Sequence, residues 1–171
     1  MKRLLLVFIA LILISPQITA QTKKEKKEQK ELKSQKDYEL MKDLVNSKSF
    51  EFNADFLLTR GNRINITSGS NTLTVSKDST RANMQYFGVV TTIGPRGSEG
   101  VSFDNVMNNY EVKYNDRKKK ISVSYTVKNK TENFNINLSI YGSGKAYLDV
   151  YSNNKSSVTY DGNVSPIKTK K

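Results

Sequence analysis

The sequence predicts a mainly β domain, an antiparallel sheet closed or packed as a barrel or sandwich, preceded by one short amphipathic helix. From residue 49 onwards, apolar and polar residues alternate in short runs, which is the period of half-buried strands. Gly, Asn and Asp turn signals, among them Asn108-Asn109 between the runs at residues 101–103 and 110–114, separate most of these runs. Just before them, the apolar spacing is helical. Nine or ten short strands, each polar on one face, fit such a sheet.

Residues 1–20 have the pattern of a cleavable secretory signal. Lys2 and Arg3 form a positive start, residues 4–14 are an unbroken apolar run, and the small Ala20 precedes the expected cleavage site. The run is shorter than the roughly 20 residues that span a bilayer. We therefore expect cleavage near Ala20, no transmembrane segment afterwards, and a protein in the periplasm or outside the cell. A retained N-terminal anchor is the alternative.

The charge of the chain is concentrated near its ends. There are 28 Lys and Arg against 16 Asp and Glu, a net charge of +12, and residues 21–37 and 168–171 form a charged stalk and a basic tail. The stalk is too polar to bury a core, so we expect a mobile tether or a solvated helix. The charge favours an anionic glycan or lipid surface, and it also keeps a protein soluble. Nucleic acid is not the expected partner, because the signal predicts export.

The absence of cysteine and histidine removes several classes of site. It excludes Ser-His-Asp and Cys-His catalysis, His or Cys zinc sites, disulfides and a lipid-modified cysteine. We expect no metal, no cofactor and no enzymatic activity. A hydrolase that uses carboxylates alone, such as Glu99 with Asp104 or Asp149 with Asp161, is a less favoured alternative.

Residues 38–167 are expected to form a single domain. At its start, Tyr38, Met41 and Val45 share one helical face, which predicts a short helix over residues 38–45 that docks on the sheet. The alternating runs that follow predict the strands. Their apolar members are Phe50, Phe52, Ala54 and Phe56; Ile64 and Ile66; Leu73 and Val75; Met84 and Tyr86; Val101 and Phe103; Tyr110, Val112 and Tyr114; Ile121, Val123, Tyr125 and Val127; Phe134, Ile136, Leu138 and Ile140; Ala146, Leu148 and Val150; Val158, Tyr160 and Val164.

Residues 91–100 interrupt the alternation with TTIGPRGSEG. This glycine-rich stretch offers backbone N–H groups and the charge of Arg96 beside Gly97, so we take both as candidate ligand-binding residues. The alternative is an ordinary long connection. The stretch is not a phosphate-binding loop, because the Lys-Ser/Thr pair and the strand-to-helix context are missing.

Two further candidates lie on predicted strands and turns. Arg117, Lys118, Lys119 and Lys120 follow a turn signal and are predicted to form a cationic hairpin tip that binds anions, or a solvated turn that protects a sheet edge. The other candidate has Tyr147, Asp149 and Tyr151 on the strand face opposite Ala146, Leu148 and Val150. Exposed tyrosines with a carboxylate are typical of a sugar-stacking or protein-binding patch, although tyrosine is also a normal outward strand residue.

Several segments spread over roughly residues 40–167 together carry a resemblance to a known family. They are Phe50-Glu51-Phe52, Ile64-Asn65-Ile66-Thr67, Tyr86-Phe87-Gly88, Gly100-Val101-Ser102-Phe103, Ser152-Asn153-Asn154-Lys155, Tyr160-Asp161-Gly162 and Pro166. With these segments the chain resembles a bacterial envelope family labelled domain of unknown function 4251. The resemblance implies exported proteins of Bacteroidetes-type bacteria, a mostly β domain and no assigned activity, so no site residues carry over. Many relatives look lipid-anchored through a cysteine, which this chain lacks.

The leading hypothesis is a non-enzymatic envelope protein whose β domain binds a ligand or partner through residues 91–100 and the exposed tyrosines. A lipocalin-like carrier of a small apolar molecule is the alternative, and it requires an unfilled barrel interior.

Overall fold

The computed structural model describes residues 17–59, 61–68, 70–87, 100–129 and 132–167, and the side chains from residue 23 onwards. It divides the chain into two compact units, residues 1–36 and 37–171. The predicted signal at residues 1–20 lies mostly outside the described residues.

Helix α2 (Gln17–Asn46) is much longer than the helix predicted over residues 38–45. Residues 21–36 are rich in Lys, Glu and Gln, which are good helix formers, so the stalk is helical. In the second unit the helix buries Tyr38 and Val45 completely, with Met41 and Leu44 partly buried beside them. The predicted apolar stripe is therefore the face that packs on the domain. Leu40 is 56% exposed.

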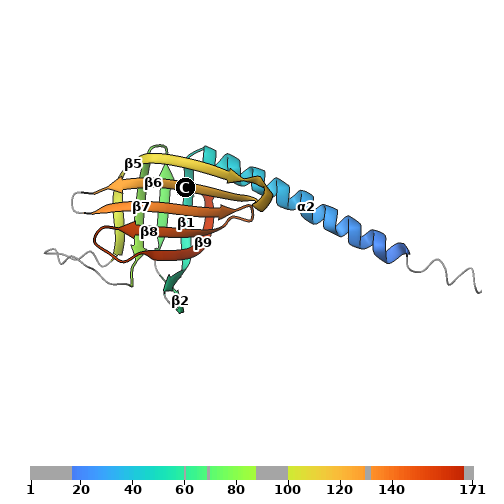
Figure 1. The fold of residues 1–171 in the computed structure, drawn as a ribbon, viewed down its shortest axis with the longest axis horizontal. Coiled ribbons are helices and arrows are strands. Elements are labelled where there is room, and N and C mark those ends of the chain that lie inside the picture. Colours follow the sequence, from blue (N-terminus) through green and yellow to red (C-terminus); the bar gives the residue numbers. More distant parts are fainter. Residues whose placement is uncertain (1–16, 60, 69, 88–99, 130–131, 168–171) are drawn as a thin grey trace, which may run out of the picture. The chain divides into compact units, whose positions relative to one another are not determined.

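The strands form a closed eight-stranded antiparallel barrel with one additional strand (Figure 1). Each barrel strand pairs with its neighbour in the meander, and β1 pairs with β9 to close the barrel. The extra strand β2 pairs with the second half of β1. The bounds are β1 (Ser49–Thr59), β2 (Asn62–Asn65), β3 (Thr72–Ser76), β4 (Ser79–Gln85), β5 (Gly100–Asn115), β6 (Lys120–Lys128), β7 (Asn133–Tyr141), β8 (Lys145–Ser152) and β9 (Val158–Pro166), with the 3-10 turn η1 (Asp116–Lys118) between β5 and β6.

The fold confirms the predicted class and decides between its two forms, because the sheet closes on itself. The alternation places apolar side chains inside the barrel, where they form one continuous core. The bulkiest fully buried side chains are Tyr38, Phe50, Phe52, Leu57, Ile66, Leu73, Met84, Ile121, Phe134, Ile136, Leu138 and Tyr160. These side chains occupy the interior, so the core gives no support to a carrier cavity.

The turn predicted at Asn108 and Asn109 is wrong. Those residues lie inside β5, where the register with β6 shifts between Asn108 and Glu111 and Asn109 has φ 55°. Asparagine tolerates this left-handed conformation, so a bulge bends the strand without ending it. The two short strands expected around residues 101–103 and 110–114 are therefore one strand of 16 residues.

Within the second unit, the end of α2 packs on the turns at one end of the barrel. The Tyr38 hydroxyl donates a hydrogen bond to Asp116 Oδ1 at 3.0 Å, which ties the helix to η1. A Cβ on Gly142, in the β7–β8 turn, would lie 3.1 Å from Tyr38 Cα. The helix backbone and this turn are thus in close contact, and a larger residue at Gly142 would crowd them.

Candidate functional site

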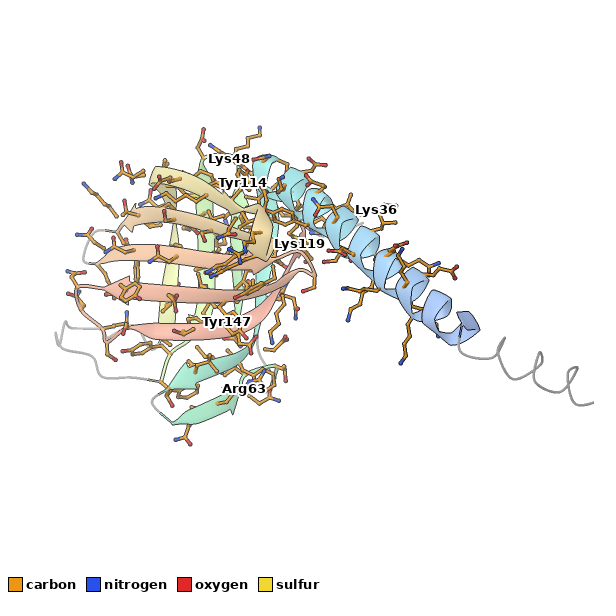
Figure 2. All side chains as sticks on the ribbon, turned by 45° about the vertical axis from the view of Figure 1, so that its right-hand side comes forward. Lys36, Lys48, Arg63, Tyr114, Lys119 and Tyr147 are labelled. Atoms are coloured by element: carbon orange, nitrogen blue, oxygen red, sulfur yellow. The ribbon has the colours of Figure 1, made fainter. Side chains whose placement is uncertain are left out.

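Strand β8 presents the predicted tyrosine patch on the outside of the barrel. Ala146, Leu148 and Val150 are at most 2% exposed, whereas Tyr147, Asp149 and Tyr151 alternate with them on the other face. The predicted orientation of the three residues is therefore correct, and their binding role stays a prediction. Figure 2 shows Tyr147 on this strand.

Neighbouring strands extend this patch with polar side chains. Across β7 and β9, Asp149 lies opposite Asn137 and Thr159, and Tyr151 lies opposite Asn135. Cross-strand partners on one face are close enough to act on the same ligand. We call this surface the β7–β8 face and define it by Asn135, Asn137, Ser139, Tyr141, Tyr147, Asp149, Tyr151 and Thr159.

Two of the three aromatic rings of the β7–β8 face, those of Tyr141 and Tyr147, contact neighbouring side chains. The rings of Tyr141 and Tyr147 meet edge to face at 86° with centroids 6.3 Å apart, and Lys145 Nζ lies 5.4 Å from the Tyr147 centroid. Tyr141 and Tyr151 are 37% and 46% exposed. A ligand at Tyr141 and Tyr147 would therefore meet rings whose positions are already restrained by contacts.

Some polar side chains of the β7–β8 face already hydrogen-bond to a neighbour, and others can still bond to a ligand. Thr159 Oγ1 donates a hydrogen bond to Asp149 Oδ1 at 2.6 Å, which orients the carboxylate. Asn135 and Asn137 are exposed, and neither side chain hydrogen-bonds to any other described residue. Each amide offers two donors and an acceptor to a ligand.

An ion cluster borders the face, and sequence reasoning missed it. Asp161 on β9 has a side chain only 9% exposed; its Oδ2 lies 2.8 Å from Arg63 Nη2 and its Oδ1 lies 3.8 Å from Lys145 Nζ. The Arg63 guanidinium carbon also lies 3.6 Å from the centroid of the Phe56 ring. Because Arg63 and Asp161 are separated by 98 residues, no local pattern indicates their contact.

Of the carboxylate pairs suggested by the sequence, Asp149 and Asp161 lie on the same outer face of β8 and β9. Asp149 is bonded to Thr159, and Asp161 is bonded to Arg63 and Lys145. Both acids belong to a sheet surface, and Glu99 lies outside the described residues. The arrangement therefore supplies fixed hydrogen-bond acceptors at the surface of the barrel.

The cationic run forms the predicted hairpin tip between β5 and β6 (Figure 2). Asn115 Oδ1 accepts a hydrogen bond from the Lys118 backbone N–H, and Lys119 has φ 48°. Arg117 and Lys118 are exposed, while Lys119 and Lys120 are half-buried. The tip is also tied to α2 through Asp116, and burial together with the hydrogen bond to Asp116 raises the pKa of Tyr38.

Two other sequence candidates, Arg96 and Gly97, lie outside the described residues. At Gly100, where β5 begins, an added Cβ would lie 2.6 Å from the Met84 carbonyl oxygen. Only glycine fits so close to the β4 backbone at this position. The end of residues 91–100 is therefore fixed by strand pairing.

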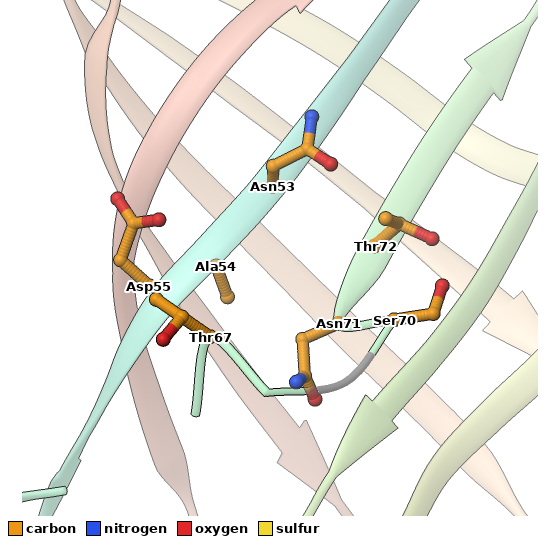
Figure 3. A pocket seen from close by; sticks show the side chains of 7 residues that line it. All are labelled: Asn53, Ala54, Asp55, Thr67, Ser70, Asn71 and Thr72. Carbon is orange, nitrogen blue, oxygen red and sulfur yellow. The ribbon is translucent and has the colours of Figure 1, made fainter. Parts of the chain in front are cut away.

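A polar pocket of about 290 Å³ lies where the pairing partner of β1 changes from β3 to β2 (Figure 3). Its buried Asn71 is already satisfied, since Nδ2 donates to the Ile66 carbonyl and Oδ1 accepts from the Gln85 N–H. Asp55 Oδ2 accepts from Asn163. The pocket is lined by Asn53, Ala54, Asp55, Thr67, Ser70, Asn71 and Thr72. These hydrogen bonds belong to the junction between the strands, and they account for the polar side chains that line the pocket.

Among the described residues, no helix combines the length and the hydropathy needed to cross a membrane. Within the same residues, no three acidic side chains gather as a metal site would require.

Comparison with known proteins finds similarity to a family without an assigned activity. The model of the family described as "Domain of unknown function (DUF4251)" matches residues 32–164. The structure is similar to the crystal structure of a DUF4251 family protein from Bacteroides eggerthii, with a TM-score of 0.60 and 18% sequence identity, covering 76% of this chain and 87% of that one. No curated protein matches the chain.

Proposed function

The chain belongs to the DUF4251 family, and on that premise we propose that it is a non-catalytic binding protein whose β7–β8 face binds a carbohydrate. The observation that carries the proposal is the composition of this face. Tyr141, Tyr147 and Tyr151 lie among amide, hydroxyl and carboxylate groups on three consecutive, hydrogen-bonded strands.

The chemistry of a sugar ring complements this face. A pyranose has an apolar C–H surface that stacks on an aromatic ring and a rim of hydroxyls that both donate and accept hydrogen bonds. Tyrosine supplies the ring, and the side chains of Asn135, Asn137 and Asp149 supply the polar partners. Tyr147 and Tyr151 are four residues apart on one strand, hence separated by about 13 Å. That spacing suits an oligosaccharide better than a monosaccharide.

The remaining chemistry of the barrel favours a polar ligand over an apolar one. The large exposed hydrophobic side chains on the β7–β8 face are Tyr141 and Tyr151, and no exposed large aliphatic side chain belongs to its defining set. A small apolar molecule would need room inside the barrel, where core side chains already pack together.

A printed array of neutral and acidic oligosaccharides, probed with the full chain, tests this function. The oligosaccharide that binds best is then titrated calorimetrically against Tyr147→Ala and Tyr151→Ala. We expect each variant to bind at least about tenfold more weakly, since buried tyrosine contacts dominate many binding sites. Tyr114→Ala is the matched control, because Tyr114 is 41% exposed on β5, outside the face. An array without signal, or equal binding by all variants, overturns the proposal.

We infer in addition that the protein acts after export. The support is the signal pattern of residues 1–20. Mass spectrometry of the protein from its native cells is expected to find a mature N-terminus near Gln21. An intact Met1 in the native protein would mean that residues 1–20 are retained as an anchor.

A further inference from the structure

We propose that the first half of α2 carries a lysine face that adsorbs to an anionic lipid bilayer. The proposal is independent of the carbohydrate function and concerns residues 23–36, all of which belong to the first unit. This stretch has seven lysines and three glutamates, and its large apolar residue, Leu32, is 71% exposed.

Helical geometry sorts these charges. At about 100° per residue, five lysines fall within about a third of the helix circumference. The glutamates and Leu32 lie on the remaining part of the circumference. We call the five residues the lysine face: Lys23, Lys26, Lys27, Lys30 and Lys33.

This arrangement is unfavourable for a helix that meets only water. The more stabilising order places Glu three or four residues before Lys, and none of Glu25, Glu28 or Glu31 has a lysine at either position. Only the weaker reverse order occurs, at Lys24–Glu28 and Lys27–Glu31. Members of the lysine face instead follow one another at those spacings and repel. No ion pair joins them to a carboxylate in the described part of the chain. An external anionic surface would relieve this repulsion.

The residue types favour lipid headgroups among anionic surfaces. The lysine face contains no arginine, so it lacks the fork that recognises a defined phosphate or sulfate in a bidentate way. Residues 23–36 contain no aromatic side chain on which nucleic-acid bases could stack. Leu32 lies away from the lysine face, so contact is by charge alone, without insertion between acyl chains.

Vesicle sedimentation with the full chain tests the proposal. Vesicles of zwitterionic lipid with a minority of phosphatidylglycerol are compared with zwitterionic vesicles, which measure binding that does not depend on charge. A lysine near an anionic membrane raises partitioning roughly fivefold. Changing all five residues of the lysine face to Gln, a good helix former, should therefore reduce partitioning onto the anionic vesicles at least about tenfold.

A charge-matched control separates the lysine face from net charge. It changes Lys24, Lys36, Arg117, Lys118 and Lys120 to Gln, which removes the same charge elsewhere in the chain. We expect this control to keep most of the binding. The proposal is overturned if the lysine-face variant and the charge-matched control lose partitioning onto the anionic vesicles equally. It is also overturned if the parent protein does not prefer anionic to zwitterionic vesicles. Tighter binding to soluble dextran sulfate than to the anionic vesicles would assign the lysine face to a polyanionic glycan and also overturn it.

Discussion

Lys155 and Glu132 form a buried ion pair between two turns of the barrel. Lys155 Nζ lies 2.7 Å from Glu132 Oε2 and 3.0 Å from Oε1, and the two side chains are 3% and 9% exposed. The Ser152 hydroxyl also donates to Glu132, and Lys155 Nζ lies 5.7 Å from the centroid of the Phe134 ring. The pair joins the β6–β7 turn to the β8–β9 turn.

Removing one partner of this ion pair is predicted to lower the free energy of unfolding more than replacing both partners with apolar residues. Lys155→Met leaves the Glu132 charge buried without its main counter-charge and should lower the free energy of unfolding by about 3–5 kcal/mol. The double variant Lys155→Met, Glu132→Leu removes both charges and should recover most of that loss. Urea denaturation measures both values. If the double variant is as unstable as Lys155→Met, the stability comes from packing and not from charge compensation.

Gly162→Ala is predicted to open the barrel at its seam, the β1–β9 pair that closes it. A Cβ at Gly162 would lie 2.0 Å from the Asn53 carbonyl oxygen and 2.8 Å from Ala54 Cα, so the β1–β9 pair would have to separate. We expect a loss of about 3 kcal/mol in the free energy of unfolding by denaturant titration. Gly61→Ala is the comparison: its Cβ would meet nothing within 4 Å, and its φ of 91° adds strain of only about 1–2 kcal/mol. Equal losses at the two glycines would contradict close packing at the seam.

Tyr110 is predicted to make stability fall at alkaline pH. Burial, assisted by the neighbouring Tyr114, raises the pKa of Tyr110 to about 12, from an ordinary value of 10.0. Because the folded state holds this proton more tightly, the contribution to stability is complete below pH 10 and is lost as the pH rises through about 12. The Tyr110→Phe variant should therefore lose less stability than the parent between about pH 10 and 12.

The same substitution has a second consequence at neutral pH. The Tyr110 hydroxyl is buried without a hydrogen-bond partner among the described residues. Its removal should raise the free energy of unfolding by about 1 kcal/mol, measured in urea at pH 7. Tyr114→Phe serves as the control, because the Tyr114 hydroxyl bonds to Asn46 and its loss should not stabilise the protein. A destabilised Tyr110→Phe would show that the hydroxyl has a partner after all.

The sequence by itself determined the local features of this protein. A two-residue period is a property of each strand, so it was enough to predict the β class and the opposite faces occupied by Leu148 and Tyr147. The helical spacing of Tyr38, Met41 and Val45 likewise predicted which side of α2 is buried. The hairpin tip at residues 117–120 followed from a local turn signal and the alternation on either side.

Only the tertiary structure decided how these elements meet. Closure depends on the register of β1 against β9, such as Phe52 opposite Val164, and no local period encodes a pairing between the two ends of the domain. The Arg63–Asp161 contact at the border of the candidate face arises in the same way. The bulge at Asn109 also escaped prediction, since asparagine signals a turn and a bulge alike. The short-range periods of apolar residues in the sequence specify the helices and strands and which of their faces are buried. Contacts between residues distant in the sequence specify the barrel and its surface.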